Sequence, residues 1–377
     1  MSYTLIAGGY RPTFALLSFD PATAKLKTLS ESKAPSNGSW IETAHPKFPN
    51  VFYAVSEEES AGTVVSLKKD GESLSITATR TAGDGPAHLH VMKDGSGIVV
   101  ANYIGGTAVF FPLESDGSLS KTSSSPALEL PFAYKDSPAP NPERQDKPHA
   151  HQVVEGKNGL LYIVDLGSDR IYVVEKQGVD ELAVKGFLQA PEGAGPRHVV
   201  ISKDGGHLYA LTELHHSLLI FTLPSSPTYP LVNDSDFEAN IIPPNVPKTH
   251  QKYMDSAELV LNPTFPQTLY ASNRWELHIK EKNPDLPEIE HASTDGDAVA
   301  IVVLSADGQK IESLSHVRTG CDAIRGMSVS PDGKYVALAG QEGGGVEIWK
   351  VEGEKGQDWK LAAKEPSLEQ IVDLVWL

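Results

Sequence analysis

The sequence has one cysteine and no long apolar segment. Because Cys321 is the only cysteine among 377 residues, an intramolecular disulfide and a multi-cysteine zinc site are both excluded. No segment approaches the roughly 18 apolar residues that a membrane helix needs. The longest clear apolar run, residues 298–304, has the length of a β-strand. These absences predict no membrane span and favour a reducing, cytosolic setting.

Basic residues are also scarce relative to acidic ones. The chain has 32 Lys and Arg against 49 Asp and Glu, which gives a formal net charge of −17. Such acidity repels phosphate backbones and anionic lipids, so nucleic-acid and membrane-surface binding are disfavoured. With 40 % hydrophobic and 21 % charged residues, the composition is that of a folded globular protein. An anionic ligand would therefore have to meet a local cationic pocket.

One pattern of short strands recurs along the chain. A polar start leads into a β-branched run, a turn, a second run, a Gly/Asn/Ser turn and a third run. In three copies the turn contains Asp-Gly, at residues 94–95, 204–205 and 332–333, which predicts tight hairpins. Equivalent positions of six copies lie 47 to 67 residues apart, at Ile41, His88, His149, Arg197, Glu258 and Arg325.

Repeats of this size predict an all-β fold, a seven-bladed β-propeller of four-stranded antiparallel blades. Strand-like runs at residues 3–7, 14–19 and 369–377 supply the seventh blade, so pairing of the N- and C-terminal strands would close the ring. Residues 1–377 then form a single domain. Three stretches interrupt the repeats, at 131–147, 224–255 and 277–295, and are expected to be surface loops or lids.

In several copies, polar side chains stand at the start of the innermost strand or one blade strand further along. A propeller brings such positions together at one mouth of its central channel. Four of these residues are cationic, namely Lys147, Arg197, Arg274 and Arg325, and they predict a site for a carboxylate or phosphate. The other polar residues expected at this mouth are His88, His90, His149, His151, His198, Glu258, Asn102, Glu213 and Asn273.

The pair His149 and His151 has the spacing of alternate strand residues, so both imidazoles point to the same face. Two histidines do not complete a zinc site, and no HExxH or cysteine motif is present. We therefore expect neither a metal nor another cofactor. A general acid/base role is predicted for His149, with structural hydrogen bonding as the alternative. Glu213 is expected beside Arg197, where it could orient a partner, accept a proton or form a simple ion pair.

These motifs, in this order, resemble the lactonase family of seven-bladed β-propellers. The residues that carry the resemblance are Asn141 to His151, Gly195 to His198, Glu213, Asn273, Arg274, Arg325 and Gly326. The family includes the propeller-type 6-phosphogluconolactonases and the fungal 3-carboxy-cis,cis-muconate cyclases. The resemblance implies a catalytic set of His149, Arg197, Glu213 and Arg274. We expect substrate binding by His88, Lys147, His151, His198, Glu258, Asn273 and Arg325.

The expected reaction is hydrolysis of a sugar-acid lactone. His149 would activate water, Arg197 and Arg274 would stabilise the oxyanion, and Glu213 would hold its neighbours in place. A second reading is the reverse chemistry, in which a carboxylate adds across an activated double bond to close a lactone, as in the muconate cyclases. A third reading is a non-enzymatic propeller that binds partners on one face. The sequence leaves open the particular lactone, its phosphorylation, the oligomeric state and the role of residues 224–255.

Overall fold

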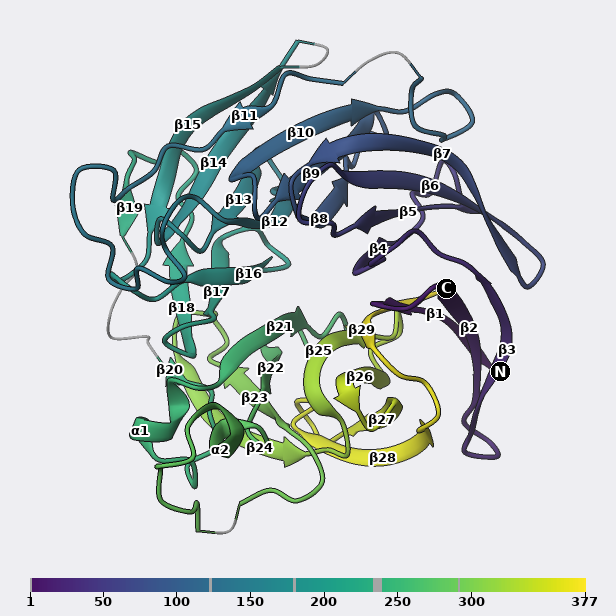
Figure 1. The fold of residues 1–377 in the computed structure, drawn as a ribbon, viewed down its shortest axis with the longest axis vertical. Coiled ribbons are helices and arrows are strands. Elements are labelled where there is room, and N and C mark those ends of the chain that lie inside the picture. Colours follow the sequence, from purple (N-terminus) through teal and green to yellow (C-terminus); the bar gives the residue numbers. More distant parts are fainter. Residues whose placement is uncertain (1, 122–123, 179–180, 233–238, 291) are drawn as a thin grey trace.

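The strands of the computed structural model form seven sheets arranged around a central axis (Figure 1). The structure describes the whole chain except residues 1, 122–123, 179–180, 233–238 and 291. In each sheet the innermost strand lies nearest the axis, and its neighbours follow outward. The predicted seven-bladed β-propeller is confirmed.

Six blades run outward in chain order from their innermost strand. The first three of these are β4 (Trp40–Glu42), β5 (Val51–Ser56), β6 (Gly62–Asp70) and β7 (Ser73–Gly83); β8 (Pro86–Val91), β9 (Gly97–Asn102), β10 (Thr107–Pro112) and β11 (Leu128–Glu129); and β12 (Ala150–Glu155), β13 (Leu161–Asp165), β14 (Arg170–Gln177) and β15 (Glu181–Gln189). The next three are β16 (Pro196–Ile201), β17 (His207–Thr212), β18 (Ser217–Thr222) and β20 (Ala239–Asn240); β21 (Asp255–Leu261), β22 (Thr268–Arg274), β23 (Ala298–Leu304) and β24 (Ile311–Arg318); and β25 (Asp322–Val329), β26 (Tyr335–Gly343), β27 (Val346–Glu352) and β28 (Asp358–Glu365).

The remaining blade joins the two ends of the chain. Its innermost strand is β29 (Ile371–Trp376), followed outward by β1 (Tyr3–Gly9), β2 (Thr13–Asp20) and β3 (Lys25–Lys33). β29 pairs antiparallel with β1, so that Leu5 lies opposite Trp376 and Ala7 opposite Leu374. The predicted closure of the ring by the terminal strands is confirmed, and it places β1 between β29 and β2.

The 224–255 insert contains more regular structure than the sequence suggested. Its strand β19 (Leu231–Val232) pairs in parallel with β15 and adds a fifth strand to that blade, and β20 completes the next blade. The insert also contains the short helix α1 (Lys248–Gln251), and a second insert contains α2 (Ile279–Lys282). Extended segments pair readily with the open edge of an outer strand. Within the described residues, neither helix has the length or apolar character to cross a membrane.

The hydrophobic core lies between neighbouring blades. The buried side chains form separate clusters, and each cluster combines residues from two adjacent sheets. Because β23 is covered on both faces, all seven of its residues are buried, which explains its unbroken apolar run. The three predicted Asp-Gly hairpins are confirmed, with positive φ at Gly95, Gly205 and Gly333.

Candidate active site

A β-bulge recurs near the start of the innermost strand in five blades. The pairing register shifts within β8, β12, β16, β21 and β25 at this point. In β16 the extra residue is Arg197, and in β12 it is His151. A bulge re-aims the side chains around it, and bulges are common next to active sites. Consecutive residues such as Arg197 and His198 can therefore both reach one site.

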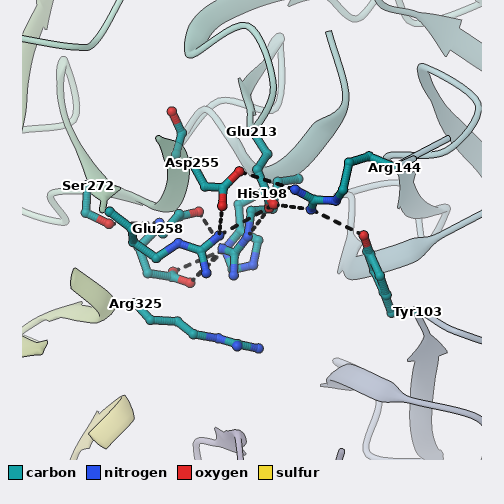
Figure 2. Close-up of polar contacts among 12 residues, drawn as sticks. Tyr103, Arg144, His198, Glu213, Asp255, Glu258, Ser272 and Arg325 are labelled. Carbon is teal, nitrogen blue, oxygen red and sulfur yellow. Dashed lines mark hydrogen bonds and ion pairs between the residues drawn. The ribbon is translucent and has the colours of Figure 1, made fainter. Parts of the chain in front are cut away.

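Glu213 lies at the centre of three arginines (Figure 2). It follows β17, and its backbone N–H donates to Gly195 O at 2.7 Å, which places it beside the start of β16. Its Oε2 lies 2.8 Å from Arg197 Nε, and its Oε1 lies 3.5 Å from Arg274 Nη2. The third arginine, Arg144, donates from Nη2 to the same Oε1. The expected convergence of Arg197, Arg274 and Glu213 is present in the structure.

The pKa values in this cluster differ from those of isolated side chains. Burial alone would raise the pKa of Glu213, but Arg144, Arg274 and Arg197 outweigh burial and hold it at about 2. Burial, together with the neighbouring Arg274, lowers the pKa of Arg197 to about 10. At neutral pH Glu213 is therefore a carboxylate and Arg197 a cation. This carboxylate orients the guanidinium groups and has little tendency to accept a proton.

Arg144 comes from the 131–147 insert and lies over the cluster. Besides Glu213, it contacts Asp255, with 3.3 Å between Nη1 and Oδ1, and Tyr103, with 3.5 Å between Nη2 and the hydroxyl oxygen. Asp255 Oδ2 lies 4.0 Å from Arg274 Nη2. The Arg144 side chain is 35 % exposed, so it is the arginine of the cluster that solvent reaches most easily.

His149 is connected to the arginine cluster through Tyr103. The two rings stack with centroids 4.5 Å apart, and the Tyr103 hydroxyl is a partner of Arg144. His149 Nδ1 lies 3.0 Å from Tyr103 O, and Nε2 lies 2.8 Å from Asp146 Oδ1. Both ring nitrogens therefore face acceptors, and a neutral imidazole can donate to only one of them. The Asp146 side chain is 56 % exposed, so it can turn away and free Nε2.

Three predicted histidines meet inside the channel. His88, His151 and His198 are buried, and the ring of His198 lies 5.0 Å from that of His151 and 6.1 Å from that of His88. Burial lowers the pKa of each well below its usual value, and neighbouring cationic groups add to this effect. All three are therefore neutral near pH 7. Among the described residues, no three His, Cys, Asp or Glu side chains are arranged to hold a metal ion.

The remaining predicted residues differ in how they are placed relative to the arginine cluster. Arg325 is paired with Glu57 at 2.9 Å and donates to the Tyr10 hydroxyl, and it faces the cluster from β25 (Figure 2). Asn273 is fully buried next to Arg274. Lys147 is exposed, and within the described part of the chain it makes no hydrogen bond or ion pair with the cluster. The expected fourth cation is thus not joined to the cluster, and Arg144 holds that place.

Several buried polar atoms at this mouth have no hydrogen-bond partner among the described residues. They are Nδ1 of His151, Nε2 of His198, Nε of Arg274 and both amide atoms of Asn273. Most buried polar groups in proteins are paired. A group of unpaired ones beside an arginine cluster is the pattern of a site that binds a polar ligand.

Sequence reasoning missed Arg144, Asp146, Asp255 and Tyr103. Arg144 and Asp146 lie within the Asn-Pro-Glu-Arg-Gln-Asp stretch that carried part of the resemblance, but nothing in the stretch shows that it folds over the mouth. Asp255 is the first residue of β21 and pairs in register with Arg274. Of the four missed residues, a search for charged residues at strand starts would have found only Asp255.

The sequence model of the family described as "Lactonase, 7-bladed beta-propeller" matches residues 4–376 of this chain. The chain belongs to this lactonase family. Among curated relatives of this lactonase-family protein, a probable 6-phosphogluconolactonase of Arthroderma benhamiae is 24 % identical over 376 residues, covering 98 % of this chain and 87 % of the relative. The 6-phosphogluconolactonase of Bacillus subtilis is 32 % identical over 210 residues, covering 54 % of this chain and 57 % of the relative.

Solved structures show the same fold. The periplasmic gluconolactonase PpgL of Pseudomonas aeruginosa superimposes on this lactonase-family protein with a TM-score of 0.81 at 22 % identity. The superposition covers 100 % of this chain and 99 % of that one. At this identity the likeness concerns the propeller fold alone.

Proposed function

We propose that this protein hydrolyses the ring ester of a sugar-acid lactone at the mouth that holds Arg197, Glu213 and Arg274. The lactone carbonyl would lie against the guanidinium groups of Arg197 and Arg274. These groups are fixed cations in a largely buried setting, so they can stabilise the oxyanion without reorganising. Glu213 would hold both of them in place and would not take part in proton transfer.

Proton transfer falls to His149 in this proposal. Water would approach from the open side of the mouth, and His149 Nε2 would take its proton once Asp146 has turned away from its 2.8 Å contact. The carbonyl oxygen of Tyr103, 3.0 Å from Nδ1, would keep the imidazole in the tautomer that has a free Nε2. The observation that carries the proposal is the convergence of two arginines on one carboxylate, with the His149 imidazole stacked on Tyr103, whose hydroxyl contacts Arg144.

The names of the relatives suggest the substrate class. Two of them are named for 6-phosphogluconolactone hydrolysis, and a structural relative is named a periplasmic gluconolactonase. Both substrates are lactones of a six-carbon sugar acid. We propose an aldonolactone of this class, and we keep the cytosolic location as a prediction.

A pH-stat assay tests the proposal directly. Hydrolysis of a lactone releases one proton, so base consumption above the spontaneous rate measures turnover of 6-phosphogluconolactone and of glucono-δ-lactone. His149→Gln and Arg197→Ala should lose that activity. Exposed Lys147 provides the matched control, since Lys147→Ala should keep most of it. If neither lactone is turned over faster than in buffer, sugar-lactone hydrolysis is ruled out for these substrates.

One observation favours lactone formation as a second candidate. With Asp146 in place, both nitrogens of His149 face acceptors, an arrangement that suits a group carrying a proton to donate. A cyclase needs such a donor to protonate carbon as the carboxylate closes the ring. Loss of diene absorbance from 3-carboxy-cis,cis-muconate would support this reaction. No turnover in either assay would favour a non-catalytic binding scaffold.

A further inference from the structure

Glu258 and His198 form a buried pair (Figure 2), and Glu258 also contacts Arg197. His198 Nδ1 lies 3.0 Å from Glu258 Oε1 and 3.1 Å from Oε2. Glu258 Oε1 also lies 3.6 Å from Arg197 Nη1. Glu258 is 5 % exposed and His198 is 1 % exposed. The backbone N–H of Glu258 donates to Ser272 Oγ at 3.0 Å, which fixes the backbone at Glu258.

One proton must lie between the two side chains. A carboxylate only accepts hydrogen bonds, so it requires an N–H at His198 Nδ1, whereas a protonated carboxyl donates to a bare Nδ1. His198 stays neutral, because burial and Arg197 lower its pKa well below the usual value. A change in the charge of Glu258 therefore moves the imidazole proton between Nδ1 and Nε2. Nε2 is buried without a hydrogen-bond partner among the described residues.

The groups that face this pair come from several strands. Arg197 is its neighbour on β16, Arg274 lies on β22, Arg325 on β25 and Asp373 on β29, while the neutral His88 and His151 face it from β8 and β12. Burial raises the pKa of Glu258 to about 7, although Arg197, Arg325 and Arg274 oppose this effect. At neutral pH the protonated and ionised forms of the Glu258 carboxyl are therefore present in similar amounts.

The charges at the mouth are almost balanced before any ligand binds. Arg144, Arg197 and Arg274 face Glu213, Asp255 and Glu258. An added anion makes the site negative unless one carboxylate is neutralised. Glu213 resists protonation because its pKa is about 2, and the Asp255 side chain is 19 % exposed and partly solvated. Of the three carboxylates that face these arginines, Glu258 most easily accepts the proton.

We propose that the Glu258–His198 pair takes up one proton when an anion binds to Arg197 and Arg274, and that His198 then changes tautomer. The inference rests on the proposed function only in placing the anionic substrate or product at these arginines. The bound anion offsets the positive charge of Arg197, and this favours the neutral carboxyl. Protonated Glu258 donates to Nδ1, so Nε2 becomes a donor toward the channel. The ligand class is a carboxylate, phosphate or sulfate group.

The proton can be observed without any ligand. Infrared spectra of the wild-type protein between pH 5 and pH 9 should show a buried protonated carboxyl band that weakens as the pH rises through about 7. Asp165, Asp297 and Asp373 are also buried with raised pKa values and contribute to this band, so Glu258→Gln should remove only the part that belongs to Glu258. The matched control is Glu155→Gln, because Glu155 belongs to a second His–Glu pair, 3.4 Å from His90 and outside the arginine cluster. A carboxyl band of equal intensity and equal pH dependence in wild type and Glu258→Gln would overturn the inference.

The coupling is tested by calorimetric titration with sulfate, whose charge is constant in this pH range. Repeating the titration in buffers of different ionisation enthalpy gives the number of protons taken up. Wild type and Glu155→Gln should take up more protons than Glu258→Gln at pH 7.5, and their affinity should fall by up to about tenfold per pH unit above pH 7. Proton uptake by groups other than Glu258 is common to the three proteins and cancels in the comparison.

The outcomes separate this inference from the proposed function. Equal proton uptake in wild type and Glu258→Gln overturns the coupling and leaves lactone hydrolysis standing. A difference in uptake without any lactone turnover supports the coupling and removes the proposed reaction. If sulfate does not bind to the wild-type protein at all, the anion site is wrong and the coupling falls with it.

Discussion

Glu213→Gln should destabilise the folded protein by about 3–4 kcal/mol at neutral pH. The pKa of about 2 lies about 2.5 below the ordinary value of 4.5, and each pKa unit corresponds to about 1.4 kcal/mol. Removing one partner of a buried ion pair typically costs about 3–5 kcal/mol, which agrees with this figure. The cost arises because Arg144, Arg197 and Arg274 lose the carboxylate that they share.

The pH dependence of this loss has a definite direction. Because the folded protein lowers the pKa of Glu213, the stabilisation is complete above pH 4.5 and is lost as the pH falls through about 2. The difference in the free energy of unfolding between wild type and Glu213→Gln should therefore be constant around pH 6 to 7. It should shrink in acid, over the range from about pH 4.5 to about pH 2.

Glu258→Gln provides the matched comparison with the opposite sign. Burial raises the pKa of Glu258 from the ordinary 4.5 to about 7, so its ionisation opposes folding. That cost is absent below pH 4.5 and grows to about 3 kcal/mol as the pH reaches 7. Glu258→Gln should therefore become more stable relative to wild type as the pH rises through this range.

Urea unfolding followed by tryptophan fluorescence measures both effects. The three proteins are compared at pH 5 and pH 7.5, with far-ultraviolet circular dichroism as a check that each variant is folded. The reasoning is refuted if Glu213→Gln is as stable as wild type at pH 7.5. It is also refuted if the two substitutions, which flank the same Arg197, change stability in the same direction at that pH.

Three further predictions concern catalysis and ring closure. Arg197→Ala and Arg274→Ala should each lower kcat by about 100-fold or more with any lactone that the wild-type protein hydrolyses, because each substitution removes an oxyanion donor. A kcat equal to that of wild type in both variants would remove these arginines from the mechanism. Arg144→Ala should raise KM more than it lowers kcat, because this arginine lies at the exposed edge of the site; steady-state kinetics showing an unchanged KM would contradict this. Trp376→Ala should lower the free energy of unfolding by about 3–5 kcal/mol, because the 6 % exposed ring packs where β29 closes the propeller; a urea midpoint equal to that of wild type would refute it.

The local sequence was sufficient to predict the architecture. Asp-Gly turns between β-branched runs set the hairpins, and the spacing from His88 to Arg325 set the blades, because these patterns depend on residues close together in the chain. Ring closure also followed, since the lone strand at the C-terminal end needs a partner and the N-terminal strands lack a fourth one. The fifth strand β19 did not follow, because its pairing with β15 depends on an edge that is distant in sequence.

The residues of the candidate site also fall into two groups, those that the sequence predicted and those that only the structure revealed. Alignment of the repeats brought Arg197, Glu213 and Arg274 together, because equivalent positions of blades meet at one mouth. It could not show that Arg144 replaces Lys147 there, that Asp146 contacts His149, or that carboxylates balance the arginines. Those features depend on how an insert folds over the channel and on bulges that turn individual side chains. The local pattern thus determined where charged residues gather, whereas three-dimensional packing decided which charges pair and which protons can move.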